Sequence, residues 1–109
     1  MRPLGDQPIR VLVVDDEIGV RNALARILRN AGMLPLTAEG GDAALEVLER
    51  DPVDVALLDV RMPGMTGPQL LSRMKVARYP AEVIMMTAFA DIATTVLSLI
   101  HISEPTRRS

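Results

Sequence analysis

Three short runs of mainly aliphatic residues each end abruptly at polar side chains. They cover residues 9–14, 53–58 and 82–86. The residues that directly follow them are Asp15, Asp59 and Thr87. A short apolar run closed by polar or turn residues is typical of a strand buried on both faces, as in a parallel sheet. A weaker run over 34–38 contains Pro35, which cannot donate to a strand ladder and therefore predicts an edge strand.

Between these runs, apolar residues recur at the three- and four-residue spacing of amphipathic helices. The stripes are Val20, Ala23, Leu24, Ile27, Leu28 and Ala31; Ala44, Leu45 and Leu48; and Leu70, Leu71 and Met74. In the first helix, which begins at Asp16 or Glu17 and stops at Gly32, the arginines 21, 26 and 29 lie mostly on the outer face.

The boundaries of the other helices follow from glycine and proline. The second helix begins after Gly40-Gly41 and closes at Asp51-Pro52, and the third begins at Gly67-Pro68, where a first-turn proline loses no hydrogen bond. A fourth begins near Asp91 and carries Ile92 and Val96. Strands and helices thus alternate, which predicts an α/β, doubly wound parallel sheet with helices on both faces and right-handed crossovers.

Length and composition narrow the class of protein. A chain of 109 residues, 49% hydrophobic and 24% charged, is one globular domain, with residues 1–8 as a flexible lead-in. The net charge of −2 gives no reason to expect nucleic-acid binding by this segment. The absence of cysteine excludes disulfides and thiolate metal sites and fits a cytoplasmic location. No apolar run is long enough to span a membrane, and residues 1–8 lack the apolar core that a signal peptide requires.

The acids that follow the strands suggest chemistry. If the sheet reverses direction at the first strand, the first and third strands are neighbours, and Asp15, Asp16 and Asp59 share one pocket at the sheet's carboxyl edge. Crowded carboxylates raise at least one pKa unless a cation joins them, and oxygen ligands without His or Cys favour Mg²⁺ or Mn²⁺. Asp59 could then attack a phosphoryl group and form an acyl phosphate near the hydroxyl of Thr87.

Each of these residues also has an ordinary structural explanation. A single Asp after a strand is usually a cap or turn residue, and Asp15-Asp16-Glu17 would suit a solvated helix N-terminus. Thr87 alone is more often a turn hydroxyl. The occurrence of polar groups at the ends of three strands, in this order, favours the shared pocket.

The motifs Val13-Val14-Asp15-Asp16-Glu17, Leu58 to Gly67 (LDVRMPGMTG) and Met86-Thr87-Ala88 together resemble the receiver domain of two-component response regulators. The resemblance covers residues 9–96. It implies a domain with a flavodoxin-like sheet of strand order 2-1-3-4-5. Such a domain is phosphorylated by a sensor histidine kinase and does not act as an enzyme on other substrates. The stretch from Thr87 to Val96 is most similar to receivers of σ54-type transcription activators. A homodimer through the distal face of the full-length protein is also compatible with the family.

The resemblance also implies roles for single residues. Asp59 is the phosphoacceptor, and Thr87 supplies the switch hydroxyl. The Mg²⁺ ligands are Asp16, Asp59 and the backbone carbonyl of Arg61, with Asp15 acting mainly through water. The phosphoryl group is also bound by the backbone amides of Val60 and Ala88.

The resemblance breaks near the C-terminus. The family has a lysine at the end of a fifth strand, but the single lysine here, Lys75, lies within the predicted third helix. We therefore expect an incomplete receiver over residues 9–96, without the fifth strand and last helix, and no effector domain. Residues 97–107 resemble a translated sequencing adapter, so we expect 97–109 not to be native. The alternative is a natural tail, helical through Ile100 and broken at Pro105.

Three other classes of function remain as alternatives. A phosphohydrolase of the haloacid dehalogenase type also uses an Asp nucleophile, but it requires Asp-x-Asp where this chain has Asp15-Asp16-Glu17. A flavodoxin-like FMN binder requires a phosphate loop rich in Gly, Ser and Thr, and the acids would repel the phosphate. A pseudo-receiver that only binds partners would not need the intact acidic triad.

Overall fold

The computed structural model describes residues 8–86, which form four strands and three helices in strict alternation. The elements are β1 (Arg10–Val14), α1 (Ile18–Asn30), β2 (Leu34–Ala38), α2 (Gly41–Arg50), β3 (Val55–Asp59), α3 (Gly67–Ala77) and β4 (Glu82–Met86). All seven lie where the hydrophobic pattern predicts them. The α/β alternation is therefore confirmed over this range.

The four strands form one parallel sheet in the order β2-β1-β3-β4. The sheet reverses direction at β1, as predicted, so β1 and β3 are neighbours, with Val14 beside Leu58. Strand β2 is an edge strand. The amide of Leu34 donates to the carbonyl of Ile9, so the next residue, Pro35, turns its nitrogen toward the open edge, where no donor is needed. This is the flavodoxin-like order over its first four strands.

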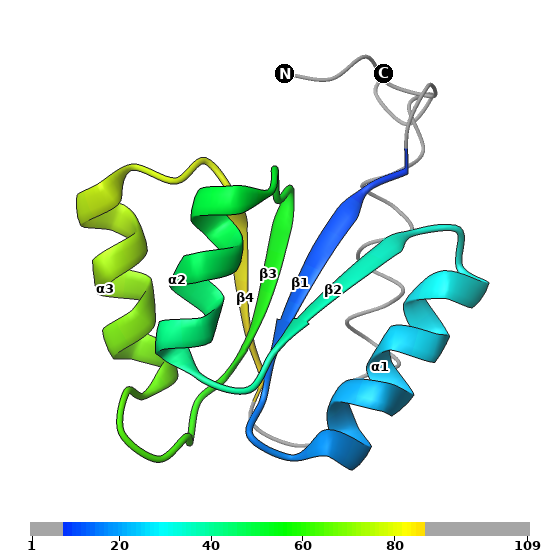
Figure 1. Cartoon of the computed structure of the whole chain (residues 1–109), viewed down its shortest axis with the longest axis horizontal. Coiled ribbons are helices and arrows are strands. Elements are labelled where there is room, and N and C mark those ends of the chain that lie inside the picture. The colour runs from blue at the N-terminus through cyan, green and yellow to red at the C-terminus, as the bar shows by residue number, and fades with distance from the viewer. Residues whose placement is uncertain (1–7, 87–109) are drawn as a thin grey trace.

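Helices cover both faces of the sheet (Figure 1). Helix α1 packs on one face, where Leu24 and Leu28 meet Val11, Val13 and Leu57. Helices α2 and α3 pack on the other face, whose core is formed by Leu12, Val14, Ala44, Leu48, Ala56, Leu58, Leu70 and Met74, among others. Successive residues of β1 and β3 thus alternate between two apolar layers, which explains why both strands are aliphatic throughout.

The loops at the carboxyl ends of the strands are shaped by local signals. Gly64 has a φ of +80°, which allows the Pro63-Gly64 turn after β3. Helix α3 then begins with a capping box, in which the amide of Gln69 donates to Thr66 Oγ1 and the amide of Thr66 donates to Gln69 Oε1. The path from β3 into α3 is therefore fixed by backbone and capping interactions.

One residue of α1 departs from the predicted pattern. Arg26 and Arg29 are exposed, as expected for the outer face, whereas Arg21 is half-buried and turned toward the carboxyl end of β1. None of the helices in residues 8–86 combines the length and apolar character needed to cross a membrane.

Several predictions fall outside the described residues. They concern Thr87, Ala88, the helix near Asp91, most of the lead-in and the tail from residue 97. The domain boundaries at 8 and 96 stay predictions as well.

Candidate functional site

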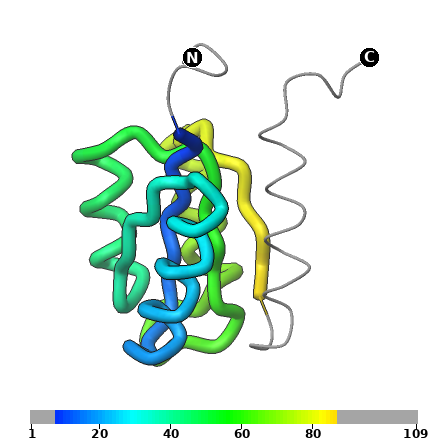
Figure 2. The backbone as a smooth tube through the Cα atoms, turned by 90° about the vertical axis from the view of Figure 1, so that its right-hand side faces the viewer, coloured from blue at the N-terminus to red at the C-terminus, as the bar shows by residue number. Residues whose placement is uncertain are grey.

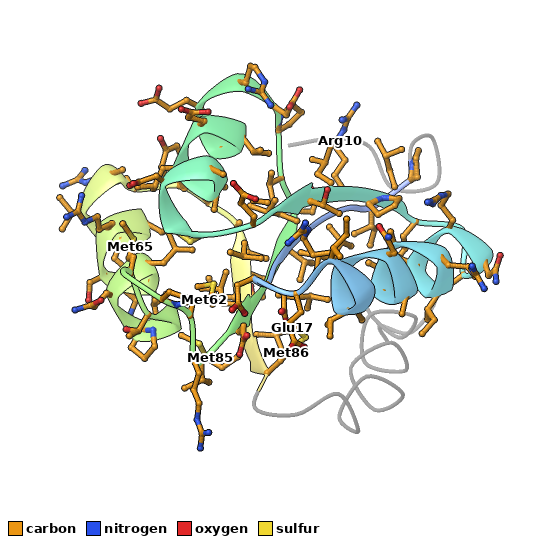
Figure 3. All side chains as sticks on the ribbon, turned by 60° about the horizontal axis from the view of Figure 1, so that its bottom comes forward. Arg10, Glu17, Met62, Met65, Met85 and Met86 are labelled. Atoms are coloured by element: carbon orange, nitrogen blue, oxygen red, sulfur yellow. The ribbon has the colours of Figure 1, made fainter. Side chains whose placement is uncertain are left out.

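The carboxyl ends of β1 and β3 bring three carboxylates together. One oxygen each from Asp15, Asp16 and Asp59 lies within 4.8 Å of the other two. Two of these residues follow β1, and the third ends β3, so the pairing of the two strands creates the cluster. Figure 2 shows the strands side by side, and Figure 3 brings their carboxyl ends forward, with Glu17, Met62 and Met86 at this edge and Arg10 far from it.

Asp15 is the most enclosed of the three acids. Its side chain is 6% exposed, and its Oδ1 accepts a 2.9 Å hydrogen bond from the backbone amide of Glu17. Burial raises the pKa of Asp15 above its ordinary value; the hydrogen bond from Glu17 opposes the rise, and the charges of Asp59, Asp16 and Glu17 add to it. A raised carboxyl pKa in this pocket is expected from crowding, but for Asp15 burial is the larger cause and the neighbouring charges are the smaller one.

Arg21 holds the loop that carries Asp15 and Asp16. From the second turn of α1, its Nη1 donates a 2.8 Å hydrogen bond to the backbone carbonyl of Asp15. The amide of Asp15 donates to the carbonyl of Ala38 in turn, at 3.2 Å. The acidic loop is therefore bound to α1 on one side and to the end of β2 on the other. Charge and periodicity alone place Arg21 with the outer arginines of α1, so this role is not visible in the sequence.

Asp59 is half-buried at the end of β3, and its Oδ1 accepts a 3.1 Å hydrogen bond from the backbone amide of Arg61. The amide of Val60, which the family resemblance assigns to the phosphoryl group, donates instead to the carbonyl of Met86 at 3.0 Å. A phosphoryl contact by Val60 would require that bond to break. The amide that is aimed at the carboxylate in the described structure is that of Arg61.

The donor set of this pocket fits a hard divalent cation. All three side chains offer carboxylate oxygens, and no His lies among the described residues. Ligands on opposite sides of an octahedral Mg²⁺ are about 4 Å apart, which is close to the upper limit of separation in this cluster. Asp16 is exposed and Asp59 half-buried, so the pocket is open to solvent, which suits an ion that keeps several water ligands.

Comparison with known families agrees with this geometry. The response regulator receiver domain family matches residues 11–101 of the chain. The chain therefore belongs to this family of two-component receivers, as the sequence motifs indicated.

Two curated relatives illustrate the range of proteins that contain such a domain. Sporulation initiation phosphotransferase F of Bacillus subtilis is 36% identical over 83 residues, which are 76% of this chain and 67% of the relative. The DNA-binding transcriptional regulator NtrC of Escherichia coli K12 is 43% identical over 86 residues, 79% of this chain. The chain spans only 18% of the length of NtrC.

Solved structures share the fold. The response regulator TrrA of Thermotoga maritima, determined in complex with Mg²⁺ and BeF, has a TM-score of 0.69 and 32% identity, covering 84% of this chain and 80% of TrrA. The chemotaxis protein CheY4 of Vibrio cholerae has a TM-score of 0.70 and 28% identity, covering 82% of this chain and 80% of CheY4. The flavodoxin-like, CheY-like class predicted from sequence is confirmed by these likenesses.

Proposed function

We propose that this receiver domain accepts a phosphoryl group on Asp59 and acts as a phosphorylation-dependent switch. The observation that carries the proposal is the convergence of Asp15, Asp16 and Asp59 at one sheet edge in a chain of the receiver family. Among these three acids, Asp59 is the last residue of β3, so the sheet holds its backbone. Its side chain is half-buried and therefore remains accessible from solvent.

In the proposed reaction, a carboxylate oxygen of Asp59 forms a bond to phosphorus. The bond between phosphorus and the donor's leaving group breaks, and the leaving group takes the electron pair. The product is an acyl phosphate on Asp59. Because the amide of Arg61 holds Oδ1 at 3.1 Å and orients the carboxylate, we assign the attack to Oδ2.

The acidic pocket is the proposed Mg²⁺ site. Asp16 and Asp59 would be direct ligands, together with the carbonyl oxygen of Arg61, and Asp15 would act mainly through water. Bound Mg²⁺ reduces the repulsion between an anionic nucleophile and an anionic phosphoryl donor. The clustering of the three carboxylates within 4.8 Å supports this assignment, because a bound cation would offset the repulsion between them. TrrA, the relative solved with Mg²⁺ and BeF, adds support by analogy. Mn²⁺ stays a prediction.

The other assignments follow from family membership. The donor in the cell would be a sensor histidine kinase, and the location would be the cytoplasm. Thr87 would supply the switch hydroxyl and Ala88 a backbone amide to the phosphoryl group. The relative NtrC is named as a DNA-binding transcriptional regulator, so an effector that controls transcription is the output we propose for a longer protein containing this chain. The chain itself would promote only its own phosphorylation and dephosphorylation.

The test is incubation of the chain with acetyl phosphate, with and without Mg²⁺, followed by intact-mass measurement and phosphate release. We expect a single phosphoryl adduct that requires Mg²⁺ and is absent from Asp59→Asn. Sustained hydrolysis of phosphate esters, with turnover beyond one phosphate per chain, would instead identify the phosphohydrolase alternative. A chain that neither forms the adduct nor releases phosphate would be a pseudo-receiver.

A further inference from the structure

Gly67, the first residue of α3, lies against the backbone of Asp59. A Cβ atom placed on Gly67 would lie 2.5 Å from the carbonyl oxygen of Asp59 and 3.2 Å from its carbonyl carbon. Real Cβ atoms essentially never come within 3.0 Å of another heavy atom in such contacts. The amide of Gly67 also donates to the carbonyl of Val60, at 3.3 Å. The start of α3 therefore packs directly on the peptide that carries the proposed phosphoacceptor.

Gly41 provides a contrast within the same molecule. A Cβ on Gly41 would meet the side chain of Met65, in the loop between β3 and α3, with the Met65 Cβ at 2.8 Å. A rotamer change moves the Met65 Sδ and Cγ atoms, and the Met65 Cβ lies in a connecting loop outside the strands, so this neighbour can shift with the loop. The neighbour of Gly67 is main chain. Asp59 pairs with Met86 in β4, and the amide of Val60 donates to the Met86 carbonyl, so the sheet holds that peptide in place.

We propose that Gly67 is a positioning residue for Asp59. Because Gly67 has no side chain, the first turn of α3 can rest on the Asp59 carbonyl and fix the direction in which the carboxylate leaves the strand. The amide of Arg61 donates to Asp59 Oδ1 at 3.1 Å, so a shift of the Asp59 peptide would also change this hydrogen bond. A methyl group at residue 67 would push the Asp59 peptide away by several tenths of an ångström or more. The inference deepens the proposed function and rests on it.

The expected effect is on the rate of phosphoryl transfer. A misplacement of about 1 Å at a reacting group can slow a reaction by roughly 100-fold. We therefore expect Gly67→Ala to lower the maximal rate of adduct formation by about 10- to 100-fold. The loss should persist at saturating Mg²⁺ and saturating acetyl phosphate, because it concerns the direction of the nucleophile.

The experiment is made in a Gly19→Ala background. Gly19 lies in α1, a Cβ there would meet nothing within 4 Å, and alanine favours the helix, so this background offsets lost stability. Gly67→Ala is compared with Gly41→Ala for maximal rate, Mg²⁺ affinity, thermal midpoint and the amide shift of Arg61. We expect both glycine variants to lose stability, but only Gly67→Ala to lose rate and to shift the Arg61 amide.

A double variant tests the nature of the contact. The Sδ atom of Met85 is also 3.2 Å from the Cβ position at residue 67, and both Met65 and Met85 are labelled in Figure 3. Gly67→Ala combined with Met85→Ala removes that side-chain contact and leaves the carbonyl contact, so we expect no recovery of the rate.

The other outcomes overturn the inference. Equal rates in Gly67→Ala and its background, an equal loss of rate in Gly41→Ala, or recovery in the Met85 double variant would contradict a positioning role. Loss of cooperative unfolding in Gly67→Ala would show that the contact serves folding instead. If the unsubstituted chain forms no adduct, the proposed function fails, and this inference fails with it.

Discussion

Arg21 Nη1 donates a 2.8 Å hydrogen bond to the backbone carbonyl oxygen of Asp15. The bond joins the second turn of α1 to the loop that carries two of the three pocket acids. It also places a guanidinium group on the main chain of this loop. The geometry of the acidic loop therefore depends on a residue of α1.

Removing this side chain should loosen the acidic loop. We expect Arg21→Ala to lower the free energy of unfolding by about 1–2 kcal/mol, since a half-buried hydrogen bond from a charged donor is lost. Its Mg²⁺ affinity should fall by about three- to tenfold, less than the roughly 10–100-fold loss seen when a direct partner of a ligand is removed. Titration calorimetry and thermal unfolding measure both, with the exposed Arg26→Ala as matched control. Equal Mg²⁺ affinities in the two variants would contradict the role of Arg21.

The two neighbouring acids should contribute unequally to metal binding. We expect the chain to bind Mg²⁺ in roughly the high-micromolar to millimolar range, as a few oxygen ligands and water allow. Asp16→Asn should weaken binding more than Asp15→Asn, because Asp16 is exposed, whereas Oδ1 of Asp15 accepts the Glu17 amide. Calorimetric titration with Mg²⁺ measures the difference. The opposite order would make Asp15 the principal ligand.

The raised pKa of Asp15 predicts a pH-dependent stability in metal-free buffer. The folded state binds the Asp15 proton more tightly than the unfolded state, so ionised Asp15 lowers stability at neutral pH. This penalty disappears as the pH falls through the raised pKa toward the ordinary value of 3.8, below which both states are protonated.

Asp15→Asn should therefore be more stable than the unsubstituted chain at pH 7 in the presence of EDTA. Asparagine retains the acceptor for the Glu17 amide and removes only the charge. The difference in thermal midpoint should shrink as the pH is lowered and vanish near pH 4, close to the ordinary pKa. Added Mg²⁺ should reduce the difference at pH 7. A difference that stays constant with pH would show that charge is not its cause.

The capping box at the start of α3 should contribute measurably to stability. Thr66→Ala removes the acceptor for the Gln69 amide, 3.3 Å from Oγ1, and should cost about 1 kcal/mol. Thr66→Ser keeps the hydroxyl and should remain within a few tenths of a kcal/mol of the unsubstituted chain. Urea unfolding measures both. An equal loss in the two variants would mean that the Thr66 methyl group matters more than its hydroxyl.

The hydrophobic pattern predicts most of the fold of the described residues. Aliphatic residues on both faces of β1 and β3 require helices on two sides, and Pro35 indicates an edge strand. The pattern alone leaves open where the sheet reverses direction, and the order of the strands is implied by the resemblance to receivers. The meeting of Asp15, Asp16 and Asp59 follows from that order, because the carboxyl ends of neighbouring parallel strands lie together.

The finer contacts could not be read from the pattern. The approach of Gly67 to the Asp59 carbonyl depends on the path of a loop that turns at Gly64 and on the packing of α3 against β3. The bond from Arg21 depends on which side of α1 faces the end of β1, within a fraction of a turn. The exact path of a loop and the exact rotation of a helix depend on tertiary packing between distant segments. Hydrophobic periodicity does not determine them.

If Asp59 is the phosphoacceptor, the phosphoryl group must lie on this residue, and its position can be located by chemical trapping. The chain is treated with acetyl phosphate and Mg²⁺, and the product is then treated with hydroxylamine, which converts an acyl phosphate to a hydroxamate. Peptide mass spectrometry then assigns the modified residue. We predict one hydroxamate, at Asp59, that depends on Mg²⁺ and is lost in Asp59→Asn. A hydroxamate at Asp15 or Asp16, or an adduct that persists at full yield in Asp59→Asn, would contradict it.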